Sequence, residues 1–453
     1  MALPVPTSSP RTVPSLLLAL AAAVLAATTL AAQPLAPVGD QAQVNHVITS
    51  GQNLPDVASG ATGDSVVVWE SSTSGGNDGS LRSIQARRYR ADGTPAGVQF
   101  QVNTWTSGEQ MSHAVAMAPD GRFVVAWQSD EGGGGPVDFD IRARVFTAAG
   151  TPIGNDFKVN TSFTAGDQRA PDVAWSGATG FGVAWESDDD AGANFDWNIV
   201  ARLYDANGSA TTGELVVNTL GGTQLDPAIA ADGAGDYLLA WESDESYGSD
   251  TTTNSIQAQV LGAGAEVQVN DHPPVAGDNN PAVAISAGGA ILVTWESTGS
   301  AGGDNSLSSI QGRLYDSGGS PGAVFQANSY ITDDQRFPTA AFLPDGRFVI
   351  GWHSYGSFGN DTSNASVQLR GFSAAAVPFA AEIQANTYVS DNQRFPALTA
   401  DGRGGLVAAW ESYGSPGDDQ NSSSIQARRF SLDLLFLDGF ESGNAGAWSQ
   451  VNP

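Results

Sequence analysis

Glutamate recurs directly after a tryptophan at one fixed place in this sequence. Two copies of the pattern carry Gln128 or His353 instead, and the five glutamates are Glu70, Glu186, Glu242, Glu296 and Glu411. Two carboxyl groups that face one substrate can act as general acid and general base, so a ring of glutamates suggests chemistry on glycosidic bonds. The recurrence of this glutamate argues against a catalytic role, because an active site needs each catalytic residue only once. A residue present in nearly every copy meets a structural need of every copy.

Arginine recurs at a second fixed place, in the run that reads Ile-Gln-Ala-Arg. One acid and one base per copy predict charge pairs within or between copies, each of modest energy where the groups are partly exposed. A glutamine three residues before a proline also recurs, and we expect it to satisfy backbone groups. The arginines are Arg87, Arg144, Arg202, Arg313, Arg370 and Arg428.

Acidic, glycine-rich segments follow the tryptophans. Calcium takes roughly six to eight oxygen ligands, which Asp, Asn and backbone carbonyls of such segments can supply. No D-x-D-x-D-G run occurs, so a merely solvated loop is the alternative. The candidate calcium ligands are Asp78, Asp188, Asp190, Asp304, Asp361 and Asp418.

Aromatic residues occur in the same connections. Aromatic rings beside Asp and Asn suit glycans, because the rings stack on sugars while the polar groups bind hydroxyls. The alternative is that the rings pack the loops onto the body of the protein. The candidate ligand-binding residues are Trp105, Trp197, Tyr247, Tyr330, Tyr355, Tyr388 and Tyr413.

Nucleophilic and transition-metal chemistry have little support. The chain has no cysteine, no G-x-S-x-G nucleophile elbow is apparent, and its four histidines are dispersed among different copies. Two carboxylates from different copies facing a central pocket could still cleave a glycan. A carbohydrate-active enzyme is therefore the second interpretation, and a non-enzymatic protein is the first.

The elements that carry these residues follow from the repeat. A strand ending in tryptophan recurs at intervals of 54 to 58 residues, and a second β pattern begins 14 or 15 residues later. A short Ala-rich run after a proline and a strand ending in Val-Asn or Ala-Asn complete each copy. The tryptophans are Trp69, Trp127, Trp185, Trp241, Trp295, Trp352 and Trp410.

Four strands in each of seven copies predict an all-β, seven-bladed β-propeller of antiparallel blades. The run Val66 to Trp69 is apolar throughout, which indicates a strand buried on both faces between neighbouring sheets. The first landmark is a lone strand at 41–45, whereas the last copy lacks such a strand. We therefore expect the N-terminal strand to complete the seventh blade. A β-solenoid or stacked sandwiches are the alternatives.

Charge and targeting signals restrict the partners. The net charge of −29, with Lys158 as the only lysine, excludes nucleic acid and anionic membranes as partners. Residues 1–32 have the pattern of a signal peptide, which predicts a secreted, periplasmic or cell-surface protein. No later segment has the roughly 20 apolar residues of a membrane span. We expect a monomer with a propeller at 33–435 and a tail at 436–453.

The repeat V-V-x-W-E-S, I-Q-A-R and F-Q-V-N-T resembles a repeat of large secreted and surface proteins of bacteria, over residues 41–430. The tail from Asp438 to Gly443 is similar to a short C-terminal segment of many exported bacterial proteins. The resemblance implies an extracellular binding or adhesion role without a defined activity. We thus expect a propeller that binds a glycan or a surface protein through its acidic, aromatic loop face, with calcium ordering the loops. A passive module of the cell envelope is a third interpretation.

Departures from the repeat indicate where a unique site would lie. They occur at His353, Gln128, Trp197 and the shortened copy at 261–266. A single site is expected near the copies that contain Trp185 and Trp352.

Overall fold

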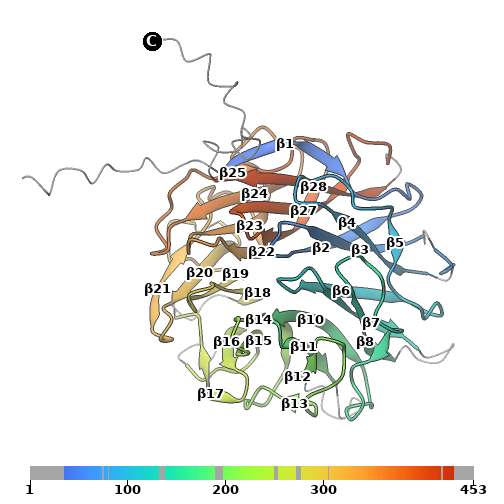
Figure 1. The fold of residues 1–453 in the computed structure, drawn as a ribbon. Coiled ribbons are helices and arrows are strands. Elements are labelled where there is room, and N and C mark those ends of the chain that lie inside the picture. The colour runs from blue at the N-terminus through green and yellow to red at the C-terminus, as the bar shows by residue number, and fades with distance from the viewer. Residues whose placement is uncertain are drawn as a thin grey trace, which may run out of the picture.

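The chain is a seven-bladed β-propeller, which confirms the predicted fold. The computed structural model describes residues 35–432, apart from 74–75, 80, 132–137, 189–196, 249–253, 272–276, 305 and 420–421. The described residues form seven four-stranded antiparallel sheets and no helix. Figure 1 shows the blades arranged around a central axis.

Each of the first six blades is a meander of four consecutive strands. Blade 1 consists of β2 (Gln52–Ser59), β3 (Ser65–Ser71), β4 (Ser83–Tyr89) and β5 (Phe100–Gln101). Blade 2 consists of β6 (Gln110–Met117), β7 (Phe123–Asp130), β8 (Phe139–Phe146) and β9 (Phe157–Lys158). Blade 3 consists of β10 (Gln168–Ser176), β11 (Gly180–Ser187), β12 (Asn198–Asp205) and β13 (Leu215–Val216).

The remaining blades follow the same order. Blade 4 consists of β14 (Gln224–Ala231), β15 (Tyr237–Ser243), β16 (Ser255–Val260) and β17 (Ala263–Gln268). Blade 5 consists of β18 (Asp278–Ile285), β19 (Ile291–Ser297), β20 (Ser309–Tyr315) and β21 (Pro321–Gln326). Blade 6 consists of β22 (Gln335–Phe342), β23 (Phe348–Tyr355), β24 (Ala365–Phe372) and β25 (Ile383–Gln384). Blade 7 consists of β26 (Gln393–Ala400), β27 (Gly405–Tyr413), β28 (Ser423–Ser431) and β1 (Ala36–Gln43).

The N-terminal strand closes the ring, as predicted. Strand β1 pairs antiparallel with β28, so the first strand of the chain is the outermost strand of the last blade (Figure 1). The strand spans 36–43 rather than the expected 41–45, because regular pairing begins at Ala36 and ends before the Val-Asn pair. The backbone N–H of Val44 still donates to the Ile425 carbonyl at 2.8 Å.

The apolar core lies between the sheets. Seven clusters of buried apolar side chains occur, and each joins one blade to the next around the ring. All seven residues of β3 are buried, as the continuous apolar run predicts for a strand between two neighbouring sheets. Each blade therefore buries its apolar side chains against the two neighbouring blades, and closure of the ring gives the first and last blades a neighbour on both faces.

The recurrent glutamine holds the recurrent tryptophan of its own blade. Gln52 Oε1 accepts the indole N–H of Trp69 at 2.9 Å, and its amide nitrogen donates to the Thr49 carbonyl at 3.5 Å. Gln52 therefore has two roles. It satisfies a backbone carbonyl, as expected, and it also accepts the indole N–H of the recurrent tryptophan. In blade 5, Asp278 replaces the glutamine and accepts from Trp295 at 3.1 Å.

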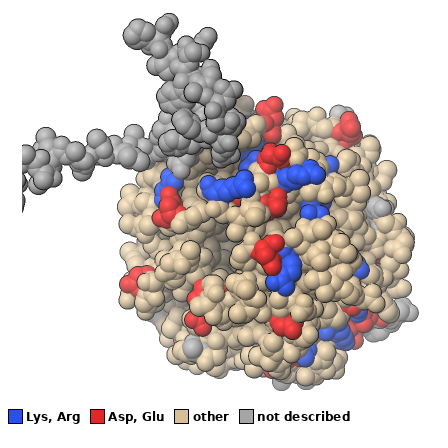
Figure 2. Space-filling view, in the orientation of Figure 1, with Lys and Arg blue, Asp and Glu red and all other residues tan. Residues whose placement is uncertain are grey.

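No helix among the described residues is long and apolar enough to cross a membrane. Figure 2 shows that uncharged residues cover most of one face and that many of the Lys and Arg side chains there lie beside Asp or Glu.

Candidate functional site

The recurrent glutamate links each blade to the next one. Glu70 Oε1 accepts the backbone N–H of Ser112 in blade 2 at 2.7 Å, and Gln128 accepts that of Ala170 in blade 3 at 3.2 Å. In blade 6, His353 Nδ1 takes the same place and accepts from Phe395 at 3.4 Å. The structural interpretation of the repeated glutamate therefore holds, but its shared partner is a backbone N–H.

The recurrent arginine also acts between blades. Arg87 donates to the Val44 carbonyl at 2.8 Å, and Arg144 donates to the Val102 carbonyl at 2.7 Å. The predicted pairing of this arginine with the glutamate is therefore wrong. The two residues bind backbone groups of opposite neighbouring blades, which satisfies polar groups at every seam.

Each backbone N–H that donates to the recurrent glutamate, or to Gln128 or His353 in its place, belongs to a residue with a positive φ. The bulge near the start of every innermost strand contains one, with φ between 44° and 52°. This left-handed conformation costs a non-glycine residue about 1–2 kcal/mol. The seven residues are Leu54, Ser112, Ala170, Asp226, Asn280, Phe337 and Phe395. The bulge directs the side chains of these seven residues toward the central channel.

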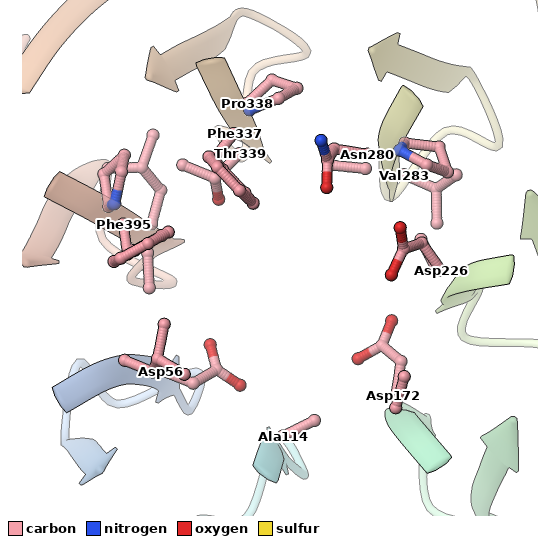
Figure 3. Close-up of a pocket in the computed structure, with 18 of the residues that line it drawn as sticks. Asp56, Ala114, Asp172, Asp226, Asn280, Val283, Phe337, Pro338, Thr339 and Phe395 are labelled. Carbon is pink, nitrogen blue, oxygen red and sulfur yellow. The ribbon is translucent and has the colours of Figure 1, made fainter. Parts of the chain in front are cut away.

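The channel mouth is a cavity of about 530 Å³ whose two sides differ in chemistry. Figure 3 shows Asp56, Asp172 and Asp226 along the lower and right parts of the ring, and Phe337 and Phe395 along its upper left part, with Asp56 next to Phe395. The acidic side comes from blades 1, 3 and 4, and the aromatic side comes from blades 6 and 7. All seven blades contribute to the lining of the mouth. The two copies where a unique site was expected are among them and lie on opposite sides.

Asp56 and Asp172 occupy a position that is alanine or threonine in the other blades. Each bridges two blades: Asp172 accepts the backbone N–H of Val173 at 2.8 Å and of Ile229 at 2.7 Å. Burial raises the pKa of Asp172 to about 7, and the negative charge of Asp56 adds to the effect. Burial raises the pKa of Asp56 to about 6. Both carboxyls therefore titrate near neutral pH.

Asp226 differs from the other acids because its side chain is exposed to the channel. Its carboxylate makes no hydrogen bond to another described residue, and it points into the mouth (Figure 3). Desolvation by the surrounding protein raises the pKa of Asp226. Burial and the charge of Asp226 raise the pKa of Glu186 to about 7, and burial, Asp226 and Glu186 raise that of Glu242 to about 8. Asp226 is the carboxylate best placed to bind a ligand.

The aromatic side is a packed set of rings. Phe337 contacts Phe395 edge-on at 4.9 Å between ring centroids and stacks on His353 at 5.4 Å. Phe337 is 36% exposed, whereas His353 is buried. Burial, reinforced by Arg336 and Arg394, lowers the pKa of His353 to about 3, so the ring is neutral. This side offers an apolar face with little net charge at its centre.

Three of the six predicted calcium ligands serve as loop anchors. Asp78, Asp304 and Asp361 are buried, and each accepts from the amide of a recurrent asparagine at 2.7 to 2.8 Å. Asp188 is half-buried, and Asp418 is exposed beside Asp419, which takes the anchor position of blade 7. Asp190 lies outside the described residues. The described residues contain no group of three or more acidic or histidine side chains that could hold a metal ion.

The predicted aromatic residues divide into two kinds. Tyr247 is 55% exposed, and Trp105 and Tyr355 also remain open to solvent. Arg142 lies over the Trp105 ring at 5.9 Å, and Arg169 lies over the half-buried Trp197 ring at 5.2 Å. The half-buried rings also include Tyr330, Tyr388 and Tyr413. Tyr330 and Tyr355 together line a second cavity of about 530 Å³ at the rim.

Sequence reasoning missed the residues of the channel mouth. The signal was present at the two or three positions between the recurrent glutamine and the Ala-rich run. Those positions change from copy to copy while their neighbours repeat. The missed residues are Asp56, Asp172, Asp226, Asn280, Phe337 and Phe395.

No known family model matches the sequence, and no curated protein is significantly similar to it. Solved structures share the fold at low identity. A protein of unknown function from Dyadobacter fermentans is 10% identical with a TM-score of 0.49, and the match covers 88% of this chain and 99% of that one. An α-L-arabinofuranosidase of Fusarium graminearum bound to arabinobiose is 15% identical with a TM-score of 0.48, covering 70% and 92%. A polysaccharide lyase is 11% identical with a TM-score of 0.48, covering 87% and 92%. Likenesses at this level carry no argument about activity.

Proposed function

We propose that the protein binds a carbohydrate in the mouth of its central channel. The observation that carries the proposal is the two-sided cavity, in which the open carboxylate of Asp226 lies across the channel from the rings of Phe337 and Phe395. Sugar rings have apolar faces that stack on aromatic side chains and hydroxyl groups that donate to carboxylates. A cavity of about 530 Å³ is within the usual range for small-molecule sites.

The charge of the site narrows the class of glycan. Several carboxylates surround the mouth, while the nearby Arg336 and Arg394 are paired with Asp334 and Glu411 at 3.0 Å. Above the raised pKa values of about 6 for Asp56 and about 7 for Asp172, an acidic sugar would therefore meet like charge. Neutral or amino sugars fit the site better than uronates or sulfated glycans. The proposal includes export of the chain, because polysaccharides of this kind are found outside the cytoplasm.

The test is affinity electrophoresis of the full chain in gels that contain xylan, arabinan, glucomannan, β-glucan, chitosan or pectin. We expect retardation by at least one neutral or amino polysaccharide and none by pectin. Asp226→Asn and Phe337→Ala should each weaken the retardation about tenfold or more. Asp236→Asn is the matched control, because it removes the same charge from an exposed turn of the same blade. Retardation by none of these polysaccharides, or equal retardation of all variants, would overturn the proposal.

A carbohydrate-active enzyme at the same mouth is the second candidate. The raised pKa values of Glu186 and Glu242 favour it, because a general acid must hold its proton near neutral pH. Against it, Glu186 already accepts the backbone N–H of Asp226 at 2.7 Å, and Glu242 is bonded to Asn254. The test is whether the protein releases reducing or unsaturated ends from the same polysaccharides. If it does, and if Asp226→Asn abolishes the release, the function is catalysis and not binding alone.

A further inference from the structure

A second cavity lies beside the channel mouth at the rim of blade 6. Its lining includes Tyr330, Tyr355, Leu307 and Asp333, and its volume is about 530 Å³. Leu307 is 57% exposed and Tyr355 is 37% exposed, so apolar surface faces solvent here. The hydroxyl groups of both tyrosines and the carboxylate of Asp333 make no hydrogen bond to any described residue. These polar groups remain available to a ligand.

In blade 7 an arginine covers the equivalent tyrosine, Tyr413. There, Arg394 donates to the Tyr413 hydroxyl at 2.8 Å and lies over its ring at 4.7 Å. In blade 6 the equivalent Arg336 turns instead to Asp334, at 3.0 Å, and toward Glu296, at 3.7 Å. Tyr355 is therefore uncovered. The exposed Tyr355 is a specific departure from the repeat, because the neighbouring copy has the same arginine and tyrosine but its arginine covers the ring.

A glycine gives the Tyr330 side chain room beside the loop that follows Tyr355, as Gly414 does for Tyr388 in blade 7. Gly356 has a φ of 92°, and a Cβ there would collide with the Tyr330 side chain. Without a side chain at 356, Tyr330 can lie against the loop next to Tyr355. A bulkier residue would displace the Tyr330 ring from the wall of the cavity.

The two cavities share a wall. Residues 333–334 line the rim cavity, and Phe337, three residues further along the same chain, lines the channel mouth. The buried ring of His353 contacts Phe337 at 5.4 Å on one side and Tyr355 at 5.7 Å on the other. A series of contacting aromatic rings thus links the channel mouth to the rim cavity, with the His353 ring buried between them.

We propose that the rim cavity is a second subsite for the same ligand, which is then a neutral oligosaccharide chain rather than a single sugar. This inference rests on the carbohydrate binding proposed above. Tyr355 supplies a stacking face, and Asp333 and the tyrosine hydroxyls supply hydrogen-bonding groups. Asp333 and Asp334 would repel an acidic chain, as the channel acids would.

The experiment is a length series. The neutral polysaccharide that retards the protein most is hydrolysed to fragments of one to six sugars, and the affinity of each is measured by calorimetry. We expect affinity to rise with length and Tyr355→Ala to remove that rise, lowering affinity for the longest fragment about tenfold while leaving the shortest unchanged. Phe337→Ala should weaken all lengths. Leu81→Ala, which removes an exposed apolar side chain that lines neither cavity, is the control.

Each outcome has a separate meaning. Affinity that does not change with length, or a Leu81→Ala variant as weak as Tyr355→Ala, would overturn the rim subsite and leave the channel site standing. Loss of all lengths in Tyr355→Ala would show one undivided site and would also overturn it. If no fragment of any length binds, the proposed function itself fails.

Discussion

The carboxylate of Glu70 in blade 1 accepts the backbone N–H of Ser112 in blade 2 at 2.7 Å. Replacing Glu70 by alanine leaves that N–H without its acceptor at a buried seam, which should lower the free energy of unfolding by about 1–3 kcal/mol. Glu70→Gln retains an acceptor oxygen, as Gln128 does one blade later, and should lose less. Denaturant unfolding measures both. Equal losses would show that the charge of Glu70, through its ion pair with Arg82, matters more than the backbone bond.

The left-handed residue at the same seam can be tested independently. Ser112 has a φ of 46°, a conformation that glycine adopts without steric cost. Ser112→Gly should leave stability unchanged or raise it by up to about 1 kcal/mol. Ser112→Val should lower it, because a branched β-carbon is strongly disfavoured at positive φ. Thermal unfolding of the two variants should shift in opposite directions.

Removal of β1 should open the ring. Gln41 Oε1 accepts the backbone N–H groups of Thr387 at 2.6 Å and Tyr388 at 3.0 Å, and Asn45 donates to Asp419 at 2.8 Å. A chain that begins at residue 46 loses these contacts and exposes the edge of β28. We expect a loss of several kcal/mol and aggregation on heating. A chain that begins at residue 33 is the control, and equal melting of the two would contradict closure by β1.

The acids of the channel should make stability fall as pH rises. The pKa values are raised to about 6 for Asp56, about 7 for Asp172 and Glu186, and about 8 for Glu242. The folded state therefore binds protons that the unfolded chain has released, and protonation favours folding. This stabilisation is complete below about pH 4 and is lost as pH rises to about 8.

Neutral variants test this pH dependence. Glu242→Gln should flatten the decline of the unfolding free energy between pH 5 and 8, because it removes the group with the highest shifted pKa. Asp236→Asn removes one exposed carboxylate from the same blade and is the control for the change in net charge. A slope of the opposite sign in the parent chain would contradict the assignment of these acids as protonated near neutral pH.

Calcium ordering of the loops stays a prediction with a direct measurement. The Asp361 carboxylate accepts from Asn386 at 2.8 Å and from Ser363 at 2.9 Å, so it has a structural use of its own. Asp361→Ala should lower stability by about 1–3 kcal/mol in chelator. If calcium also binds at these loops, excess calcium should raise the melting temperature of the parent chain above its value in chelator. No rise would leave these carboxylates as loop anchors only.

The fold was predictable because it depends on repeated residues. Seven tryptophans in register and apolar strands between them are local patterns, and the lone first strand shows how the ring closes. The partners of Glu70 and Arg87 were not predictable, because a sequence shows charges but not the unsatisfied backbone groups of a neighbouring sheet. The channel mouth was missed for a related reason. Asp226 and Phe337 lie 111 positions apart, and only the bulge in each innermost strand turns both into one cavity.

The closure of the ring also sets the order in which the protein can fold. Gln41 in β1 bonds to Gln426 in β28, 385 positions later in the chain. During synthesis β1 emerges first, and it has no partner strand until the last blade has been made. The inner blades can assemble in sequence against one another as they appear. The final seam requires the longest loop of all to close, so we expect the joining of β1 to β28 to be the slowest step of folding.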